Sequence, residues 1–233
     1  CDYSSNGIMK KIIIFIAVIL IIIGGLFYLR HQVYYSHGNY KSDKKFEIVA
    51  FTADNPTIDI LCDLPVIDFN VIETKYNPSE YKMLIVIGYS ERNQKRRKVF
   101  ERVKTKGYSM VNYIHPTSII HKSTKMGENC IILENNVFQP HVSIGDDLGM
   151  LSSNVISHHV KIEDHCFITE HVCVGGRVVI GSGSTLGFNS TIKQRVKIAK
   201  KTFVGASVFV KSDTTENCVY EAPDSKILSS KEE

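Results

Sequence analysis

The sequence predicts two domains: an amino-terminal α/β domain with a small, Rossmann-like parallel sheet, followed by a parallel β-helix. Three observations carry this prediction. Apolar residues recur at every sixth position in the second half, short apolar segments flank a helical segment in the first half, and 233 residues are enough for two cores. We expect an extension at 1–8, the α/β domain at 9–112, the β-helix at 113–212 and a tail at 213–233.

The six-residue repeat is the strongest pattern in the chain. Sixteen positions spaced six apart, from Ile120 to Val210, are all apolar. A period of six fits neither a helix nor a simple amphipathic strand, but it suits a solenoid in which each flat side takes one hexad. The apolar residues are therefore expected to point inward. Glycine follows the apolar residue at six positions, where we expect it to allow the corners to turn. These are Gly127, Gly145, Gly175, Gly181, Gly187 and Gly205.

The region before the repeat reads as alternating strands and helix. FEIVAFTADNP at 46–56 and MLIVIGY at 83–89 are short apolar segments that end at turn residues. Ser90 is expected to cap a helix that stops at Gly107, and SMVNYI at 109–114 is expected to form a third strand. Strand, helix and strand in this order predict a parallel sheet with binding sites at the carboxyl ends of its strands.

An unbroken apolar run at 12–29, IIIFIAVILIIIGGLFYL, follows two lysines. Two interpretations stay open. Eighteen apolar residues are just enough to anchor the chain in the cytoplasmic membrane. Alternatively, VILIII at 18–23 is a buried strand that turns at Gly24 and Gly25 into a helix, because interior parallel strands also read as continuous Ile and Val.

Charge and cysteine content narrow the class of protein. The chain has 28 basic and 24 acidic residues and no long tract of one sign, so a nucleic-acid partner is not expected. Its six cysteines form no C-x-x-C pair, and a chain of this length does not need disulfides for stability. We therefore expect reduced thiols and a cytoplasmic protein.

The segment 153–176 holds four of the nine histidines, which raises the question of a metal site, a catalytic base or surface imidazoles. His159, His165 and His171 recur every six residues and should point outward from three different sides, so they cannot meet at one metal within a subunit. We predict no metal ligands and expect these three to be solvated or interface side chains. His141 lies eighteen residues before His159 and should stack on it, one coil away.

Three segments resemble bacterial sugar O- and N-acetyltransferases of the sialic-acid O-acetyltransferase family. They are IHPTSII at 114–120, ISHHVKIEDHCFI at 156–168 and the closing VYEAPDSK at 219–226, and the resemblance covers about residues 45–226. It implies a left-handed β-helix that forms a homotrimer, with acetyl-CoA as co-substrate in the groove between subunits. It also implies a sugar or nucleotide-sugar acceptor and a role in surface-glycan biosynthesis.

The resemblance also implies roles for individual residues. The family's catalytic histidine matches His158, and His159, at the next position, which is often acidic in relatives, is a second catalytic candidate that would assist His158. Acetyl-CoA contacts would fall on Gly175, Gly176, Gly187 and Gly205, and nucleotide contacts on Gly24, Gly25 and Asp54. The closing segment departs from the family's V-G-x-P-A-K, so contacts with acetyl-CoA at that end are expected to differ.

The chemistry of acetyl transfer explains why a histidine is wanted. A sugar amine or hydroxyl must lose a proton as it attacks a thioester, and an imidazole can accept that proton near neutral pH. Two other hypotheses remain. One is a zinc enzyme of the carbonic-anhydrase type that uses histidines from two subunits. The other is a catalytically inactive trimeric scaffold.

Overall fold

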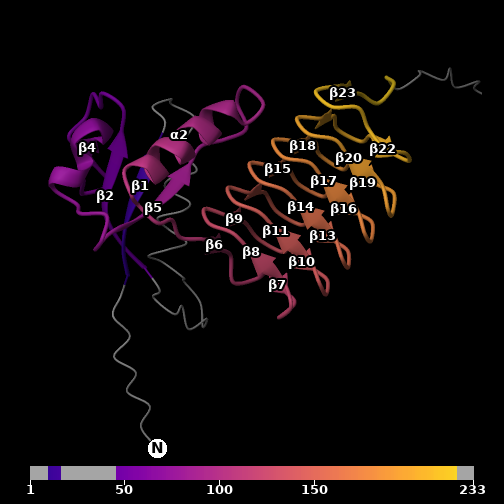
Figure 1. Cartoon of the computed structure of the whole chain (residues 1–233), viewed down its shortest axis with the longest axis horizontal. Coiled ribbons are helices and arrows are strands. Elements are labelled where there is room, and N and C mark those ends of the chain that lie inside the picture. The colour runs from indigo at the N-terminus through magenta and orange to yellow at the C-terminus, as the bar shows by residue number, and fades with distance from the viewer. Residues whose placement is uncertain (1–9, 17–45, 225–233) are drawn as a thin grey trace, which may run out of the picture. The chain divides into compact units, whose positions relative to one another are not determined.

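The computed structural model describes residues 10–16 and 46–224 (Figure 1). The chain divides into two compact units. The first comprises Cys1–Gly88 and Arg96–Asn112, and the second comprises Tyr89–Lys95 and Tyr113–Glu233. The short segment Tyr89–Lys95 therefore belongs with the second unit, although the residues on both sides of it belong to the first.

The first unit is built on a five-stranded sheet. Its strands run in the order β3-β4-β2-β1-β5, and β1, β2, β4 and β5 are parallel while β3 is antiparallel to β4. The 3-10 helix η1 and the helix α2 complete it, and Ile13, Met83 and Val103 are fully buried in its core. The elements are β1 (Lys10–Ile16), β2 (Phe46–Ala53), β3 (Ile60–Leu61), β4 (Leu64–Asp68), η1 (Phe69–Thr74), β5 (Lys82–Val86) and α2 (Gln94–Thr105).

The apolar run starts inside this sheet. Residues 12–16 belong to β1, which pairs with β2 and β5, and Ile13 and Ile14 are buried. The strand thus lies earlier than the expected 18–23, which falls outside the described residues together with Gly24 and Gly25. The membrane-anchor interpretation loses its first five residues to the sheet, which leaves thirteen where a helix needs about 20 to cross a bilayer. Within 10–16 and 46–224, no helix has the length and apolar character of a membrane span.

Two further expectations for this region are wrong in detail. The helix α2 begins at Gln94 rather than after Ser90, because Glu91, Arg92 and Asn93 have left-handed φ angles of 53°, 50° and 66° and cannot continue into a right-handed helix. The expected third strand at 109–114 is divided. Met110 makes an isolated parallel bridge to Met83, whereas β6 pairs with β9 of the β-helix.

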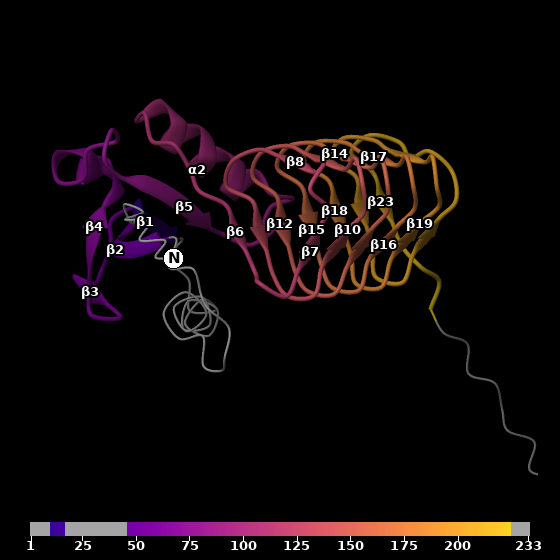
Figure 2. The same cartoon turned by 90° about the horizontal axis from the view of Figure 1, so that it is seen from below.

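The second unit is a parallel β-helix, as the hexads predict, and Figures 1 and 2 show its coils stacked in sequence. Each coil contributes one two-residue strand to each of three sheets, named here after a central strand. The β13 sheet holds β7 (Ile119–Ile120), β10 (Val137–Phe138), β13 (Val155–Ile156), β16 (Cys173–Val174), β19 (Thr191–Ile192) and β22 (Phe209–Val210). The β14 sheet holds β8 (Lys125–Met126), β11 (Ser143–Ile144), β14 (Lys161–Ile162), β17 (Val179–Ile180) and β20 (Lys197–Ile198). The β15 sheet holds β6 (Tyr113–Ile114), β9 (Ile131–Ile132), β12 (Gly149–Met150), β15 (Phe167–Ile168), β18 (Thr185–Leu186), β21 (Phe203–Val204) and β23 (Val219–Tyr220).

The hexad residue is the second residue of each two-residue strand from β7 to β22. It points into the prism, and nearly all of these side chains are buried, including Ile156, Ile168 and Val174. Ile120 and Met126, at the first coil, are partly exposed. Because strands of successive coils pair in parallel register, each inward side chain packs on the equivalent side chains of neighbouring coils.

An asparagine ladder lies inside one corner of the prism. The side-chain Nδ2 of Asn154 donates to Oδ1 of Asn136 at 2.9 Å, and Oδ1 of Asn154 accepts from the backbone N–H of Val172 at 2.7 Å. Both asparagines are fully buried. Their amides therefore link three successive coils and supply partners to backbone groups that water cannot reach.

The expected reason for the recurring glycines is wrong. The corners turn two residues later, where the φ angle is near +60° and the residue is usually Asn, Asp, His, Arg, Lys or Ser. The glycines have no such φ angle. A Cβ atom on Gly175 would lie 2.5 Å from the backbone nitrogen of Gln194, and one on Gly187 would lie 2.7 Å from the carbonyl carbon of Gly205. Glycine is needed at these positions because the backbones of adjacent coils approach closely.

Candidate active site

His158 and His159 lie at the corner between the β13 and β14 sheets, directly after β13. Both side chains are exposed. Backbone contacts with the preceding coil hold this corner, because the N–H of His158 donates to Oε1 of Gln139 at 3.1 Å and that of His159 to the carbonyl of Pro140 at 3.0 Å. The following coil adds a third contact, from the N–H of Arg177 to the carbonyl of His158 at 3.0 Å. A well-anchored backbone therefore presents two imidazoles on the surface.

The two imidazoles are in direct contact. Nδ1 of His158 lies 3.1 Å from Nδ1 of His159, and the ring planes are nearly perpendicular at 85°. The ring of His159 also stacks on that of His141, with centroids 4.8 Å apart and planes 34° from parallel. The eighteen-residue spacing correctly predicted this second contact. The contact between neighbouring rings depends on side-chain rotamers, so the spacing could not predict it.

Gly176 provides the space in which the ring of His158 lies. A Cβ atom on this glycine would come within 2.7 Å of Cε1 and 2.8 Å of Nε2 of His158, closer than side-chain atoms pack. Gly176 follows His158 by eighteen residues, so the two occupy the same place on successive coils. The imidazole therefore rests against bare backbone.

Three basic side chains surround the imidazole of His159. Loss of hydration beside these neighbours lowers its pKa most, and the protonatable rings of His141 and His158 and the positive charge of Arg177 lower the pKa further. His159 is therefore mainly neutral near pH 7, and one of its ring nitrogens keeps a lone pair. Neither Arg177 nor Gln139 was identified from the sequence as a neighbour of the two histidines. Arg177 follows His159 by eighteen residues and Gln139 precedes His158 by nineteen, so the length of one coil could have predicted both contacts.

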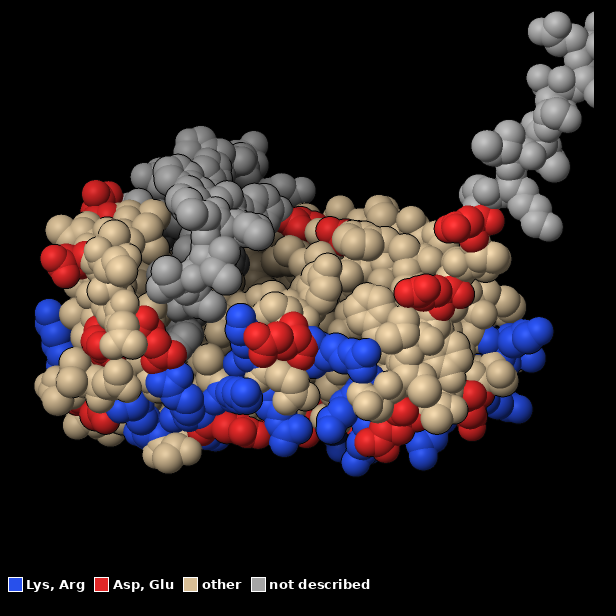
Figure 3. Space-filling view, turned by 90° about the horizontal axis from the view of Figure 1, so that it is seen from above, with Lys and Arg blue, Asp and Glu red and all other residues tan. Residues whose placement is uncertain are grey.

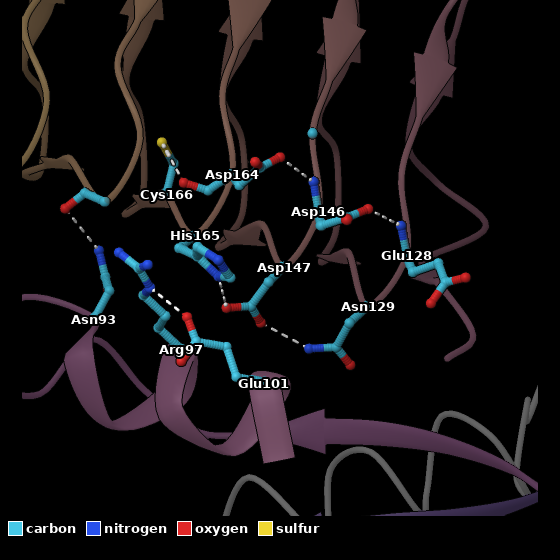
Figure 4. A network of polar contacts seen from close by, with 12 residues as sticks. Asn93, Arg97, Glu101, Glu128, Asn129, Asp146, Asp147, Asp164, His165 and Cys166 are labelled. Atoms are coloured by element: carbon cyan, nitrogen blue, oxygen red, sulfur yellow. Dashed lines mark hydrogen bonds and ion pairs between the residues drawn. The ribbon is translucent and has the colours of Figure 1, made fainter. Parts of the chain in front are cut away.

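The other outward histidines lie at separate corners. His165 follows β14 by three residues and His171 follows β15 by three residues, so they leave the prism from sides different from that of His159, as predicted. Of the two expected states, solvated or at an interface, the solvated one is wrong for His165, whose side chain is only 12% exposed. Its Nδ1 lies 2.9 Å from Oδ2 of the buried Asp147, whose Oδ1 accepts from Nδ2 of Asn129 at 2.8 Å, and Figure 4 shows these three side chains in a row. Among residues 10–16 and 46–224, no group of three His, Cys, Asp or Glu side chains is arranged to hold a metal ion.

The predicted acetyl-CoA glycines do not share one corner within a chain. Gly175 and Gly176 follow β16 and adjoin His158, whereas Gly187 and Gly205 follow β18 and β21 and lie at the corner between the β15 and β13 sheets. Within one subunit the four glycines therefore lie at two corners, and their contact with acetyl-CoA in a groove between subunits stays a prediction. Gly187 is twelve residues from Gly175, which is two sides of the prism rather than a full coil.

The predicted nucleotide residue Asp54 lies in the first unit, directly after β2. Its carboxylate accepts two hydrogen bonds from the guanidinium of Arg102, at 2.7 and 2.6 Å. This pairing holds the pKa of Asp54 below its usual value. Because Gly24 and Gly25 lie outside the described residues, the structure tests no further part of the predicted nucleotide site.

The three outer faces of the β-helix differ in character. Two outward residues of the β15 sheet, Phe167 and Thr185, are covered by Tyr89–Lys95, through a ring contact of Tyr89 with Phe167 and a hydrogen bond from Asn93 to Thr185. The outward residues of the β14 sheet include the exposed Lys125, Lys161 and Lys197, and Figure 3 shows Lys and Arg side chains interspersed with Asp and Glu on one face of the β-helix. The outward column of the β13 sheet is uncharged and mostly apolar, and it consists of Ile119, Val137, Val155, Cys173, Thr191 and Phe209.

This apolar column is exposed in the single chain. Ile119 is 66% exposed, Val155 39% and Phe209 61%. Exposed apolar side chains in one continuous row are typical of a surface that another protein covers. The row borders the corner that carries His158 and His159, so a partner on this face would complete one wall of the site.

No protein-family model matches the chain. Solved structures match its fold over nearly its whole length. A His-to-Ala variant of GDP-perosamine N-acetyltransferase from Caulobacter crescentus, in complex with CoA and GDP-perosamine, has a TM-score of 0.75 and 19% identity, covering 91% of this chain and 93% of that one. The acetyltransferase domain of PglB from Neisseria gonorrhoeae FA1090, in complex with acetyl coenzyme A, has a TM-score of 0.71 and 19% identity, covering 90% and 95%. At these identities the likeness establishes a shared fold.

Proposed function

We propose that the chain is an acetyltransferase that moves the acetyl group of acetyl-CoA to an amine of a nucleotide-linked sugar. The observation that carries the proposal is the exposed imidazole of His158, set against Gly176 at a corner of a parallel β-helix. The fold adds support, since similar structures include sugar N-acetyltransferases crystallised with CoA and with GDP-perosamine. Together with the motifs at 114–120 and 156–168, these observations favour membership of the sialic-acid O-acetyltransferase family, acting on nitrogen rather than oxygen.

In this proposal His158 is the general base. The amine nitrogen attacks the thioester carbonyl carbon, and Nε2 of His158 accepts the proton that the amine loses. The carbon–sulfur bond then breaks, and the proton passes to the leaving thiolate of CoA. The exposed position of His158 suits this role, because both substrates must reach Nε2 from solvent.

The second unit also offers an electrostatic site for the phosphates of CoA. Between Gly187 and Ser212 the sequence has six basic residues and no acidic ones, and all six side chains are exposed. Two of them, Lys193 and Arg195, share the corner of His158 two coils further on, at roughly 10 Å for about 4.8 Å per coil. Positive charge at this distance attracts the diphosphate end of an extended CoA molecule.

The exposed apolar column of the β13 sheet supports a homotrimer. Isolated apolar rows of this kind are covered when identical subunits associate around a closed axis. Association through this face would place the His158 corner at the edge of a subunit interface, where a groove between left-handed β-helices can hold acetyl-CoA. Gly187 and Gly205, on the other edge of the same sheet, would then face a groove with the neighbouring subunit. Both proposed substrates are cytoplasmic metabolites, which fits the predicted location.

An acceptor screen tests the proposal directly. The full chain is incubated with acetyl-CoA carrying a labelled acetyl group and with a panel of nucleotide-linked amino sugars, their hydroxyl counterparts and free sialic acids. We expect the label to enter an amino sugar and the His158→Ala variant to transfer none. Transfer only to hydroxyl groups would overturn the choice of nitrogen, and no transfer to any acceptor would contradict the proposed activity.

A further inference from the structure

We propose that His159 is a positioning residue whose neutral imidazole accepts a hydrogen bond from Nδ1–H of His158, so that Nε2 of His158 is left unprotonated as the base. The inference rests on the proposed function, because the need for a base at Nε2 decides which ring donates. The contact that carries it is the 3.1 Å separation between the two Nδ1 atoms, which is within hydrogen-bond distance. Nδ1 of His158 thus has a partner, whereas its Nε2 lies over Gly176, which has no side chain.

Counting protons leaves two arrangements, and the need for a base at Nε2 selects one of them. Two Nδ1 atoms 3.1 Å apart share one hydrogen, so one ring donates and the other accepts. If His159 donated, Nδ1 of His158 would be the acceptor and its single proton would sit on Nε2, which would leave no lone pair to receive the proton of the amine. If both rings carried Nδ1–H, two donors would face each other. Only donation by His158 gives a base that is free at Nε2.

The surroundings of His159 favour the neutral form that this role requires. The groups that face it are His141 from the preceding coil, Arg177 from the following coil and His158 beside it. None is acidic. Loss of hydration and these three groups lower its pKa, so protonation of His159 is delayed to lower pH and its lone pair persists through neutrality. The ring is also held in place, because it stacks on His141 at 4.8 Å.

A neutral acceptor has a consequence that a carboxylate would not have. When His158 takes the proton of the amine it becomes an imidazolium, and a carboxylate partner would stabilise that charge more strongly than an imidazole does. Replacing His159 by aspartate should therefore favour the protonated form of His158 and move the acid limb of the rate profile to higher pH.

Variants at His159 distinguish a hydrogen-bond acceptor from a side chain that only fills space. Its φ angle is 59°, which asparagine and aspartate tolerate better than most residues. The His159→Asn variant places an amide oxygen near the position of Nδ1, whereas His159→Ala places nothing there. His171 has the same left-handed backbone, with φ at 58°, at a corner without His158. His171→Ala is thus the matched control for backbone strain.

The experiment measures the tautomer of His158 by nitrogen-15 NMR on the full chain labelled at histidine, with signals assigned through the His158→Gln variant. We expect Nδ1 protonated and Nε2 unprotonated in the native protein, in His171→Ala and in His159→Asn. In His159→Ala we expect His158 to revert to the Nε2–H form that predominates in free histidine. The kcat of acetyl transfer should fall roughly 10- to 150-fold in His159→Ala, as for loss of a hydrogen bond to a charged group, and recover in His159→Asn.

The outcomes distinguish this inference from the proposed function. A native His158 that carries its proton on Nε2, or a tautomer that is unchanged in His159→Ala, would overturn the role of His159 even if acetyl transfer depends on His158. The expected tautomers without any acetyl transfer would leave the hydrogen bond established and contradict the proposed activity. Equal loss of kcat in His159→Ala and His171→Ala would show that backbone strain, not the acceptor, is responsible.

Discussion

Substitution of Gly176 by alanine should lower the rate on the order of 10²-fold while leaving the fold intact. The new Cβ would lie 2.7 Å from Cε1 of His158, whereas ordinary contacts begin at 3.4 Å, so the ring must withdraw by about 0.7 Å. A displacement of the base approaching 1 Å costs on the order of 10²-fold in rate. Because the clashing atoms belong to an exposed side chain that can rotate away, the free energy of unfolding should change by less than about 1 kcal/mol.

Gly175→Ala is the matched comparison, one residue away. There the Cβ would lie 2.5 Å from the backbone nitrogen of Gln194, and backbone cannot rotate aside, so we expect a loss of roughly 1–3 kcal/mol in unfolding free energy. Steady-state release of CoA thiol measures activity, and thermal unfolding followed by circular dichroism measures stability. Full activity in Gly176→Ala would contradict this prediction, because it would mean that the His158 ring does not act from its position against Gly176.

Three further predictions concern assembly and stability. Val155→Asp places a charge in the apolar column and should convert the proposed trimer to monomers in light scattering, whereas Lys125→Asp on the β14 sheet should not. A trimeric Val155→Asp variant would exclude this face as the interface. Asn154→Ala orphans the backbone N–H of Val172 and should lower the unfolding free energy by roughly 1–3 kcal/mol per unpaired group, measured in urea, and unchanged stability would argue against the ladder. Burial raises the pKa of Tyr113 to about 12 from 10.0, so the unfolded state ionises first and the free energy of unfolding falls as the pH rises from 10 towards 12. Tyr113→Phe should reduce that alkaline loss, and it should be neutral or slightly stabilising at pH 7 because the described residues offer the hydroxyl no partner.

The coil of the β-helix could be predicted because each six-residue repeat of the sequence forms one side of the prism. One hexad makes one side, so the phase of Ile156 or Val174 identifies which side chain is inward without knowledge of any distant contact. The same logic placed His141 against His159 and separated His165 from His171. These predictions depend only on the number of residues per side and per coil, which the sequence contains.

Features that depend on how surfaces meet could not be obtained in this way. The role of Gly176 follows from where a neighbouring ring lies, and the hydrogen bond of His165 to Asp147 follows from burial at a corner. The segment Tyr89–Lys95 read as the start of a helix, yet its packing on the β15 sheet imposes left-handed backbone at three residues. In each case a tertiary contact overrides a local preference, and a single sequence does not contain that contact.

The rate of acetyl transfer by His158→Ala is the decisive test of His158 as the general base. It should be measured with saturating acetyl-CoA and the acceptor identified in the screen, alongside acetyl-CoA affinity and the oligomeric state of the same preparation. We expect kcat to fall roughly 10²- to 10⁴-fold, the usual contribution of a general base, while the acetyl-CoA affinity and the oligomeric state stay unchanged. A variant as active as the native protein would contradict the assignment of His158 as the base.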